Sequence, residues 1–346
     1  MEVLIIGGTG YMGRITTQLL LDRGDNVTIF SRGTSKPEWW DQVKHIPGDR
    51  DDRDDFVDKL KGHQFDAVID TQAYKKEDVE SAAATFRGNI GRYLMVSTGS
   101  VYLEGTVDFF NRCPYSESDV DWSSIDYTYP SGEDPYAVGK RHCEKWLDEN
   151  AGGLDAGFPY SIVRVPAVMG SNDPTGRMWW WVQRALDGGG VIIPPDATGA
   201  YRTLYSADAA VNFVRILDVP QTVGETYYVA MPEIMDLRRW AHLIWSAAGQ
   251  ECKITNIPRQ VIRRQDSLRT YAPPMSRSVN NIHDLSKANQ AFGIVTTPVE
   301  DWIQVTVDWY RDHYQGEDSD GYQFRQDEID LADHWEEQYE RFTGGF

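Results

Sequence analysis

The sequence is poor in cysteine and in candidate metal ligands. Its 346 residues include three cysteines, Cys113, Cys143 and Cys252, and none of them forms a C-x-x-C pair. An odd number of unpaired cysteines predicts free thiols in a reducing cytoplasm. The seven histidines are scattered, without an H-E-x-x-H motif or a His/Cys cluster, so we expect no metal site.

Long apolar runs are absent and positive charge is scarce. No run reaches the roughly 18 apolar residues that cross a bilayer, and the opening strand pattern does not resemble a secretory signal. Lys and Arg number 34 against 53 Asp and Glu, a net charge of −19. Because nucleic-acid affinity depends on cations that neutralise phosphates, this balance argues against a nucleic-acid partner. We expect a small-molecule substrate and neither a nucleic-acid nor a membrane partner.

Short apolar strands alternate with helical patterns through the first 170 residues. Strands are expected at 2–6, 26–30, 43–46, 65–70, 92–97 and 160–165, and helices at 15–22, 77–86 and 134–150. This alternation predicts an α/β Rossmann fold with a doubly wound parallel sheet. Residues 1–170 would form this NAD(P)-binding domain. Residues 171–314 are expected to form mostly a smaller substrate lobe, with some elements that return to the main sheet.

Residues 315–346 form an acidic tail with an apolar stripe at helical spacing. The stripe consists of Ile329, Ala332, Trp335, Tyr339 and Phe342. It could dock on the main body, contact another subunit or cover an active site, and the pattern alone does not choose among these.

A glycine-rich turn follows the first strand. Residues 7–13 read Gly-Gly-Thr-Gly-Tyr-Met-Gly and lead directly into the first helix. Gly7 permits a tight turn, Gly10 lets the backbone approach a pyrophosphate, and Gly13 lets the helix pack closely on the strand. The helix N-terminus offers unpaired N–H groups to the phosphates. We therefore predict a dinucleotide-binding turn, in which further cofactor contacts are Thr9, Tyr11, Met12 and Arg14.

The end of the second strand indicates which dinucleotide binds. An acid there would favour NAD, but the chain has Ser31 and Arg32. A hydroxyl and a guanidinium suit a 2′-phosphate, so we predict NADP, with NAD as the alternative. Arg14 is also well placed for that phosphate. At the adenine end we expect Asp49 and Arg50, although Asp49 could equally cap a turn.

Tyr136 and Lys140 are four residues apart in the helix expected at 134–150, so their side chains share one face. A tyrosine titrates near a pKa of about 10, and lowering that by about 3 units requires roughly 4 kcal/mol. The lysine ammonium and an oxidised nicotinamide can together supply it. Thr98 ends the fifth strand, at the sheet edge where such folds bind ligands, and its hydroxyl can hold the substrate oxygen.

These motifs resemble, in order and spacing, those of extended short-chain dehydrogenases/reductases of the NAD-dependent epimerase/dehydratase family. The Arg164-Val-Pro166 strand and the segments 202–208 and 284–293 resemble further family elements, so the resemblance covers residues 1 to about 315. It implies that Thr98, Tyr136 and Lys140 are catalytic and that Ala73 and Pro166 line the nicotinamide ribose. Many members dimerise through the helix that carries the Tyr-x-x-x-Lys motif, which leaves a homodimer open.

The resemblance also implies substrate contacts. Arg202 fits a pyrophosphate-gripping arginine, Arg277 a second clamp, and Ser100 a contact beside Thr98. Trp180, within the run Trp179–Trp181, could stack on a sugar or an apolar ring, or could be part of a lobe core or dimer face.

Departures from the family pattern narrow the reaction. Sugar dehydratases carry acids directly after the catalytic threonine, whereas this chain has Gly99 and Ser100, so elimination is disfavoured. The sequence predicts an NAD(P)-dependent enzyme that transfers hydride at a carbinol or ketone carbon of a sugar, nucleotide sugar or related molecule, either as an epimerase or as a reductase/dehydrogenase, with Tyr136 as acid/base. The alternative is a non-catalytic nucleotide-sensing or RNA-handling protein on the same fold, since the late segment also resembles a plastid subgroup that handles RNA. The net charge opposes that role.

Overall fold

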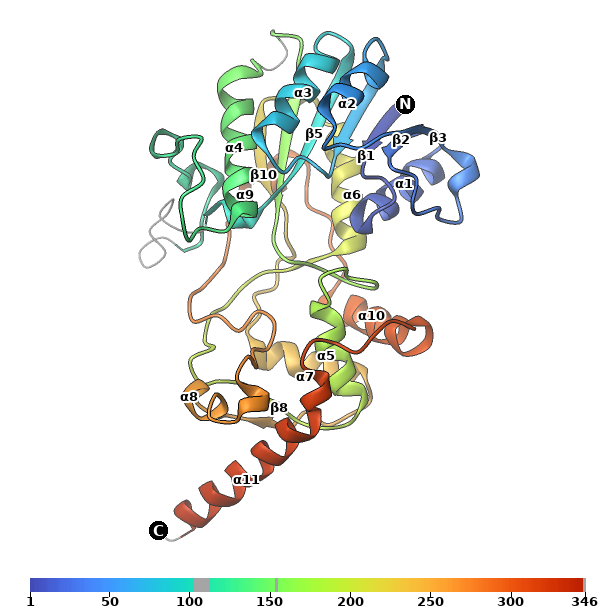
Figure 1. Cartoon of the computed structure of the whole chain (residues 1–346). Coiled ribbons are helices and arrows are strands. Elements are labelled where there is room, and N and C mark those ends of the chain that lie inside the picture. Colours follow the sequence, from blue (N-terminus) through green and yellow to red (C-terminus); the bar gives the residue numbers. More distant parts are fainter. Residues whose placement is uncertain (103–112, 153–154, 345–346) are drawn as a thin grey trace. The chain divides into compact units, whose positions relative to one another are not determined.

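A computed structural model describes residues 1–102, 113–152 and 155–344. The chain forms two compact units (Figure 1). The first contains residues 1–168, 203–231 and 283–296, and the second contains residues 169–202, 232–282 and 297–346.

Seven parallel strands form the sheet of the first unit, in the order β10-β6-β5-β4-β1-β2-β3. The strands are β1 (Glu2–Ile6), β2 (Asn26–Ser31), β3 (Lys44–Pro47), β4 (Phe65–Asp70), β5 (Ile90–Thr98), β6 (Tyr160–Val165) and β10 (Glu225–Tyr228). The chain begins at β1, winds out to β3, and then returns to β4 and winds out to β10. The order therefore reverses between β1 and β4, which is where open sheets of this kind bind ligands. The predicted doubly wound parallel sheet is confirmed.

Helices cover both faces of this sheet (Figure 1). Along β1 the side chains alternate: Ile5 enters the core that contains Leu20 and Phe213, while Leu4 enters the core that contains Phe56 and Leu147. The first core packs under α1 (Tyr11–Arg23) and α6 (Ser206–Leu217), and the second under α2 (Arg53–Leu60), α3 (Lys76–Phe86) and α4 (Pro135–Asn150). A short helix, α9 (Ser286–Ala291), packs beside β10.

The second unit is mainly helical. Its helices are α5 (Arg177–Leu186), α7 (Leu237–Ala247), α8 (Arg259–Ile262), α10 (Val299–His313) and α11 (Arg325–Thr343), and its parallel strand pair is β8 (Val191–Ile192) with β11 (Ile254–Thr255). In the first unit, β9 (Leu204–Tyr205) pairs with β7 (Val168–Met169), where the chain leaves that unit. Among the described residues, no helix has the length and apolarity needed to span a bilayer, and no cluster of His, Cys, Asp and Glu could hold a metal.

The apolar stripe of the tail is only partly covered within its unit. Ala332 and the partly buried Trp335 join a cluster with Ile192. Tyr339 and Phe342, further along α11, are 63% and 70% exposed. The first half of α11 therefore packs on the second unit through apolar contacts, and the second half extends beyond that cluster.

Candidate dinucleotide and catalytic site

The glycine turn between β1 and α1 is closed to side chains at two positions and open at a third. A Cβ on Gly13 would lie 2.3 Å from the carbonyl oxygen of Gly7. Gly7 has φ +86°, and a Cβ there would lie 2.5 Å from Thr71 Oγ1. By contrast, a Cβ on Gly10 would meet only the Gly7 carbonyl oxygen, at 3.5 Å. The turn thus requires glycine at 7 and 13 for its own packing, and at Gly10 it leaves space for a pyrophosphate.

A cavity of about 250 Å³ opens beside this turn. Its wall includes most of the residues predicted to bind the cofactor: Gly7, Thr9, Gly10, Ser31, Arg32, Asp49 and Arg50. Arg32 is exposed there and makes no hydrogen bond or ion pair with any described residue. The Ser31 hydroxyl lies 3.2 Å from His45 Nε2. A free guanidinium beside a hydroxyl and an imidazole is suited to a phosphorylated ribose.

Two residues predicted to contact the cofactor are engaged within the protein. Arg14 forms an ion pair with Glu38 at 2.5 Å, both partners being well exposed. Asp49 accepts a hydrogen bond from the amide of Asp51 at 3.0 Å, as expected for a residue that caps a turn.

Other residues predicted to contact the cofactor are held mainly by contacts within the protein. Arg50 is buried and donates to the Ser81 hydroxyl at 2.9 Å, to Asp70 at 3.3 Å and to the Asp78 carbonyl. Tyr11 and Met12 pack partly buried against the sheet core, Ala73 is fully buried, and Pro166 is half-buried just after β6.

Helix α4, which carries Tyr136 and Lys140, begins one residue before Tyr136. Asp134 caps α4 by accepting from the Tyr136 amide at 3.0 Å, and Pro135 occupies the first turn. Lys140 is 2% exposed and donates to the Val96 carbonyl at 2.7 Å. Its ammonium lies 6.0 Å from the centre of the Tyr136 ring, which is 42% exposed. The structure thus brings an accessible phenol close to a buried ammonium, although the two make no direct hydrogen bond.

Thr98 ends β5 and is nearly buried. Its hydroxyl accepts from the Ser100 amide at 3.1 Å and donates to the Ser100 hydroxyl at 3.3 Å. Gly99, between them, faces the ring of Tyr228: a Cβ there would lie 2.8 Å from the phenol oxygen. The glycine is therefore required by packing, and a longer side chain at this position would displace Tyr228.

Tyr74 is a site residue that sequence reasoning missed. It lines the same cavity as the glycine turn, and its ring lies 4.7 Å from the Lys140 ammonium and 6.0 Å from the Tyr136 ring. Burial, with the nearby Tyr136 phenol, raises the pKa of Tyr74 to about 12, so it stays neutral. Its position just beyond the end of β4, at the same sheet edge as Thr98, is the signal that could have identified it.

Burial also determines the electrostatics of Lys140. Desolvation lowers the pKa of its ammonium, while the nearby charges of Asp70, Asp78 and Glu144 oppose that shift. These carboxylates help to keep a positive charge beneath the exposed phenol.

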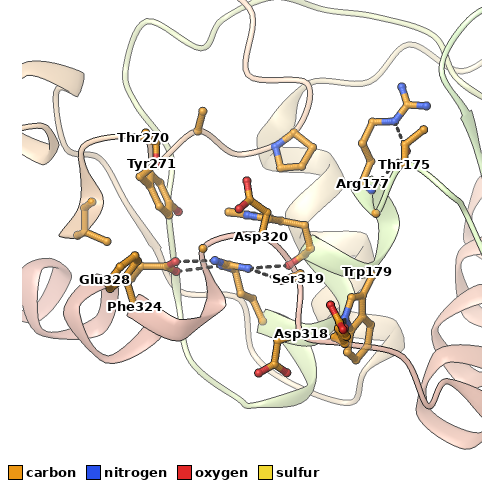
Figure 2. A pocket seen from close by; sticks show the side chains of 18 of the residues that line it. Thr175, Arg177, Trp179, Thr270, Tyr271, Asp318, Ser319, Asp320, Phe324 and Glu328 are labelled. Carbon is orange, nitrogen blue, oxygen red and sulfur yellow. Dashed lines mark hydrogen bonds and ion pairs between the residues drawn. The ribbon is translucent and has the colours of Figure 1, made fainter. Parts of the chain in front are cut away.

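Three residues of the second unit are predicted to contact the substrate: Arg202, Arg277 and Trp180. They do not all line one cavity. The Arg202 guanidinium donates to the Pro232 carbonyl, and the Arg277 carbonyl accepts from Gly199 at 2.9 Å. Trp180 lines a separate cavity of about 380 Å³ (Figure 2). The Arg184 guanidinium lies over its ring at 3.8 Å and pairs with Glu328, and both residues line that cavity.

The tryptophan run has three different environments. Trp181 is fully buried, Trp180 is 6% exposed at the cavity, and the partly exposed Trp179 donates to the Glu317 carbonyl at 3.0 Å. Most of the indole surface of these three tryptophans is thus used for packing inside the second unit.

The profile of the NAD dependent epimerase/dehydratase family matches residues 3–230. The chain belongs to this family. It is 28% identical over 244 residues to the chloroplast stem-loop binding protein of 41 kDa b from Arabidopsis thaliana, a match that covers 66% of this chain and 58% of that protein. It is 23% identical over 265 residues to 2′-dehydrokanamycin reductase from Streptomyces kanamyceticus, covering 75% of this chain and 70% of the reductase.

Solved structures share the fold. A UDP-glucose 4-epimerase from Thermotoga maritima with UDP-glucose superposes with a TM-score of 0.68 at 18% identity, over 90% of this chain and 99% of the epimerase. The Bordetella bronchiseptica enzyme WbmH, in complex with NAD+, gives a TM-score of 0.64 at 20% identity, over 90% of this chain and 99% of that enzyme.

Proposed function

We propose that the protein is an NADP-dependent oxidoreductase that acts at a carbinol or ketone carbon of a sugar, nucleotide sugar or related small molecule, as a reductase or dehydrogenase. One observation carries the proposal: the exposed phenol of Tyr136 lies over the buried ammonium of Lys140, 6.0 Å from ring centre to nitrogen. This pair is what proton transfer to or from a substrate oxygen requires.

Each residue has a distinct part in this reaction. Tyr136 donates the proton to the carbonyl oxygen during reduction, or removes it from the hydroxyl during oxidation. Lys140 stabilises the phenolate by its charge. Thr98 holds the substrate oxygen, exchanging its present bond to Ser100 for one to the substrate. A bound nicotinamide supplies or accepts the hydride.

The glycine turn and its neighbouring cavity fit such a dinucleotide. The turn excludes side chains at Gly7 and Gly13 and leaves space beside Gly10. NADP is favoured over NAD because the cavity wall presents the unpaired Arg32 with Ser31 and carries no acid at the end of β2.

Elimination is disfavoured by packing as well as by composition. An acid at position 99 would overlap Tyr228, since even a Cβ there would lie 2.8 Å from the phenol oxygen. The site therefore has no carboxylate directly after Thr98 to help expel water. The relative named 2′-dehydrokanamycin reductase supports a ketone on a sugar-like ring as the first substrate class to try.

The proposal is tested by incubating the purified protein with NADPH or NADH and a panel of keto sugars, including 2′-dehydrokanamycin, while following absorbance at 340 nm. We expect consumption of NADPH in preference to NADH. Interconversion of sugar epimers by protein that retains its nicotinamide, without net NADPH consumption, would identify an epimerase instead. No turnover of any substrate in either direction would count against the catalytic assignment.

The stem-loop binding relative supports a second candidate, an RNA-handling protein. The net charge of −19 opposes it, because phosphate backbones bind to Lys and Arg. A mobility-shift titration with a structured RNA at low salt separates the two candidates, and we expect no complex.

A further inference from the structure

A fully buried ion pair lies beneath the catalytic residues and is not used by the proposed chemistry. It joins Glu144 of α4 to Arg164 of β6, and both side chains are 1% exposed. Arg164 donates to Glu144 Oε2 from Nη2 at 2.7 Å and from Nε at 3.0 Å, and to Oε1 from Nε at 3.2 Å. Burial alone would lower the pKa of Arg164, but the Glu144 carboxylate outweighs it and the pKa is raised, so the guanidinium stays charged.

Both Arg164 and Glu144 also form hydrogen bonds outside the ion pair. The remaining Arg164 nitrogen, Nη1, donates to the Tyr102 phenol at 2.7 Å and to the Glu117 carbonyl at 3.2 Å. Glu144 Oε1 accepts from the hydroxyl of Ser97, which is itself 1% exposed. Ser97 directly precedes Thr98, so the ion pair is bonded to the end of the strand that carries the catalytic hydroxyl.

The same helix face carries the other two catalytic residues. Tyr136, Lys140 and Glu144 follow at intervals of four along α4, so they project from one face, one turn apart. Lys140 bonds to Val96 and Glu144 to Ser97, which are consecutive residues of β5. These two bonds are one helical turn apart on α4 and one residue apart on β5. Together they determine the position of α4 along the strand and its rotation about its own axis.

Stability alone does not account for this arrangement. A buried ion pair costs desolvation that its attraction roughly repays, and an apolar pair of similar volume often does as well or better. In some proteins, buried polar or ionic groups instead fix a single register between the elements that they join. Here the joined elements are the ones that carry Thr98, Tyr136 and Lys140.

We propose that Glu144, held by Arg164, is a positioning residue for the reaction: through Ser97 it sets the register of α4 against β5 and so places Tyr136 and Lys140 relative to Thr98. The proposal rests on the proposed function for its catalytic meaning. If Glu144 acts through Ser97, removing the Ser97 hydroxyl should reduce catalysis. The ion pair and the glycine turn should stay intact in that variant.

The test uses Ser97→Ala, with Ser97→Thr as the rescue and Ser161→Ala as the matched control. Ser161 is a buried serine of the neighbouring strand β6; it also contacts a buried arginine, accepting from Arg92 at 3.0 Å, and it donates to the Thr222 carbonyl at 2.6 Å. It lies near the opposite end of the sheet from Thr98. The two alanine variants should therefore lose comparable thermal stability, but only Ser97→Ala should slow catalysis.

Three measurements distinguish the outcomes. Amide hydrogen exchange without dinucleotide should accelerate at residues 96–100 and 137–145 in Ser97→Ala but not in Ser161→Ala. NADPH affinity should change less than twofold in either variant. Hydride transfer in a single turnover should slow about tenfold or more in Ser97→Ala alone, since small misplacements of reacting groups are costly, and Ser97→Thr should restore most of it.

The results that would overturn the proposal differ from those that would overturn the function. If wild-type protein transfers hydride and Ser97→Ala does so at the same rate, or if both alanine variants slow equally, Glu144 has no positioning role. Unchanged exchange at residues 96–100 in Ser97→Ala has the same meaning. If the wild-type protein transfers no hydride at all, the proposed function fails first, and the positioning role with it.

Discussion

The Lys140 ammonium donates to the carbonyl oxygen of Val96 at 2.7 Å, so helix α4 is bonded directly to the strand that ends in Thr98. The ring of Tyr74 covers the same ammonium at 4.7 Å. The lysine is thus enclosed by backbone and aromatic groups, with Tyr136 as its accessible neighbour. Its charge acts on the phenol from the protein side, with the ammonium 6.0 Å from the ring centre.

Replacing Tyr136 with phenylalanine should abolish turnover while leaving cofactor binding nearly unchanged. The phenol is exposed and its ring stays in place, but the proton that it transfers is lost. We expect a decrease in kcat of about 10²–10⁴-fold, the usual size of general acid–base catalysis. Steady-state kinetics and calorimetric titration with NADP+ measure the two effects. Full activity in this variant would disprove the mechanism.

Replacing Lys140 with methionine should remove activity without lowering stability at pH 7. Burial lowers the pKa of Lys140 below its unfolded value, so keeping the ammonium charged costs folding free energy at neutral pH. Between the lowered pKa and about 10.4, the unfolded chain binds more protons than the folded one, so the wild type gains stability relative to the variant as the pH rises.

Urea denaturation of wild type and Lys140→Met at pH 7, 9 and 10 checks this sign. The exposed Lys44 provides the control, since Lys44→Met should leave the pH dependence unchanged. A wild type that becomes less stable relative to Lys140→Met on going from pH 7 to 10 would mean that the pKa is raised by its acidic neighbours.

The sheet could be predicted closely from the sequence, and the reason is visible in its strands. The predicted ranges of β1, β4 and β6 match the observed bounds, because Val, Ile and aromatic residues, which favour strands, make up at least half of each. The helix α2 was not predicted, since in a highly acidic segment only Phe56 and Leu60 are buried. Two apolar residues one turn apart are too weak a periodic signal.

The candidate site could be predicted where its residues lie in short motifs, and not where it depends on contacts between distant residues. The turn at Gly7 and the Tyr136/Lys140 pair belong to the first kind. The ion pair of Arg14 with Glu38 joins residues 24 apart, and Tyr74 approaches Lys140 from another element. No local pattern contains either contact.

The glycine turn allows binding and folding to be separated by two alanine substitutions. Gly10 has φ −83°, and an added Cβ would meet only one atom, at an ordinary 3.5 Å. Gly10→Ala should therefore fold normally and weaken NADPH binding at least tenfold, because the methyl group occupies the space of the phosphates. Gly13→Ala, with its 2.3 Å contact to Gly7, should lose about 1–3 kcal/mol of stability.

Thermal melts and NADPH titrations of both variants provide the comparison. Wild-type affinity in Gly10→Ala would mean that no pyrophosphate approaches the backbone at this turn.

Changing Arg32 to glutamate should reverse the preference for the phosphorylated dinucleotide. Arg32 is unpaired on the cavity wall, so its charge is available to a 2′-phosphate. A charged hydrogen bond of this kind is worth about 1.5–3 kcal/mol, and we expect NADPH affinity to fall by at least the corresponding factor of roughly 10 to 100, with little loss for NADH. Arg14→Ala should have a smaller effect, because Glu38 already neutralises Arg14. Equal loss for both dinucleotides in Arg32→Glu would show that Arg32 contacts something other than the 2′-phosphate.

The buried pair of Arg184 and Glu328 should hold the start of α11 on the second unit. Arg184 donates to Glu328 at 2.5 and 2.9 Å, and both are at most 2% exposed. Glu328→Gln leaves a buried guanidinium without its counter-ion and should cost about 3–5 kcal/mol. The double variant Arg184→Met/Glu328→Leu should recover part of that loss, since Arg184 no longer carries a charge and Arg325, which also bonds Glu328 at 2.9 Å, keeps Asp187 as its partner at 2.8 Å.

The exposed pair of Glu337 with Arg341, 4.0 Å apart on the same helix, is the control, and Glu337→Gln should change stability by less than about 0.5 kcal/mol. Urea denaturation followed by tryptophan fluorescence reports mainly on the second unit, which contains eight of the twelve tryptophans, including Trp180 and Trp181 on the same helix as Arg184. If Glu328→Gln proved as mild as Glu337→Gln, water would have to reach Arg184, and α11 would be held by its other contacts, which include the apolar contacts of Ala332 and Trp335 and the ion pair of Arg325 with Asp187.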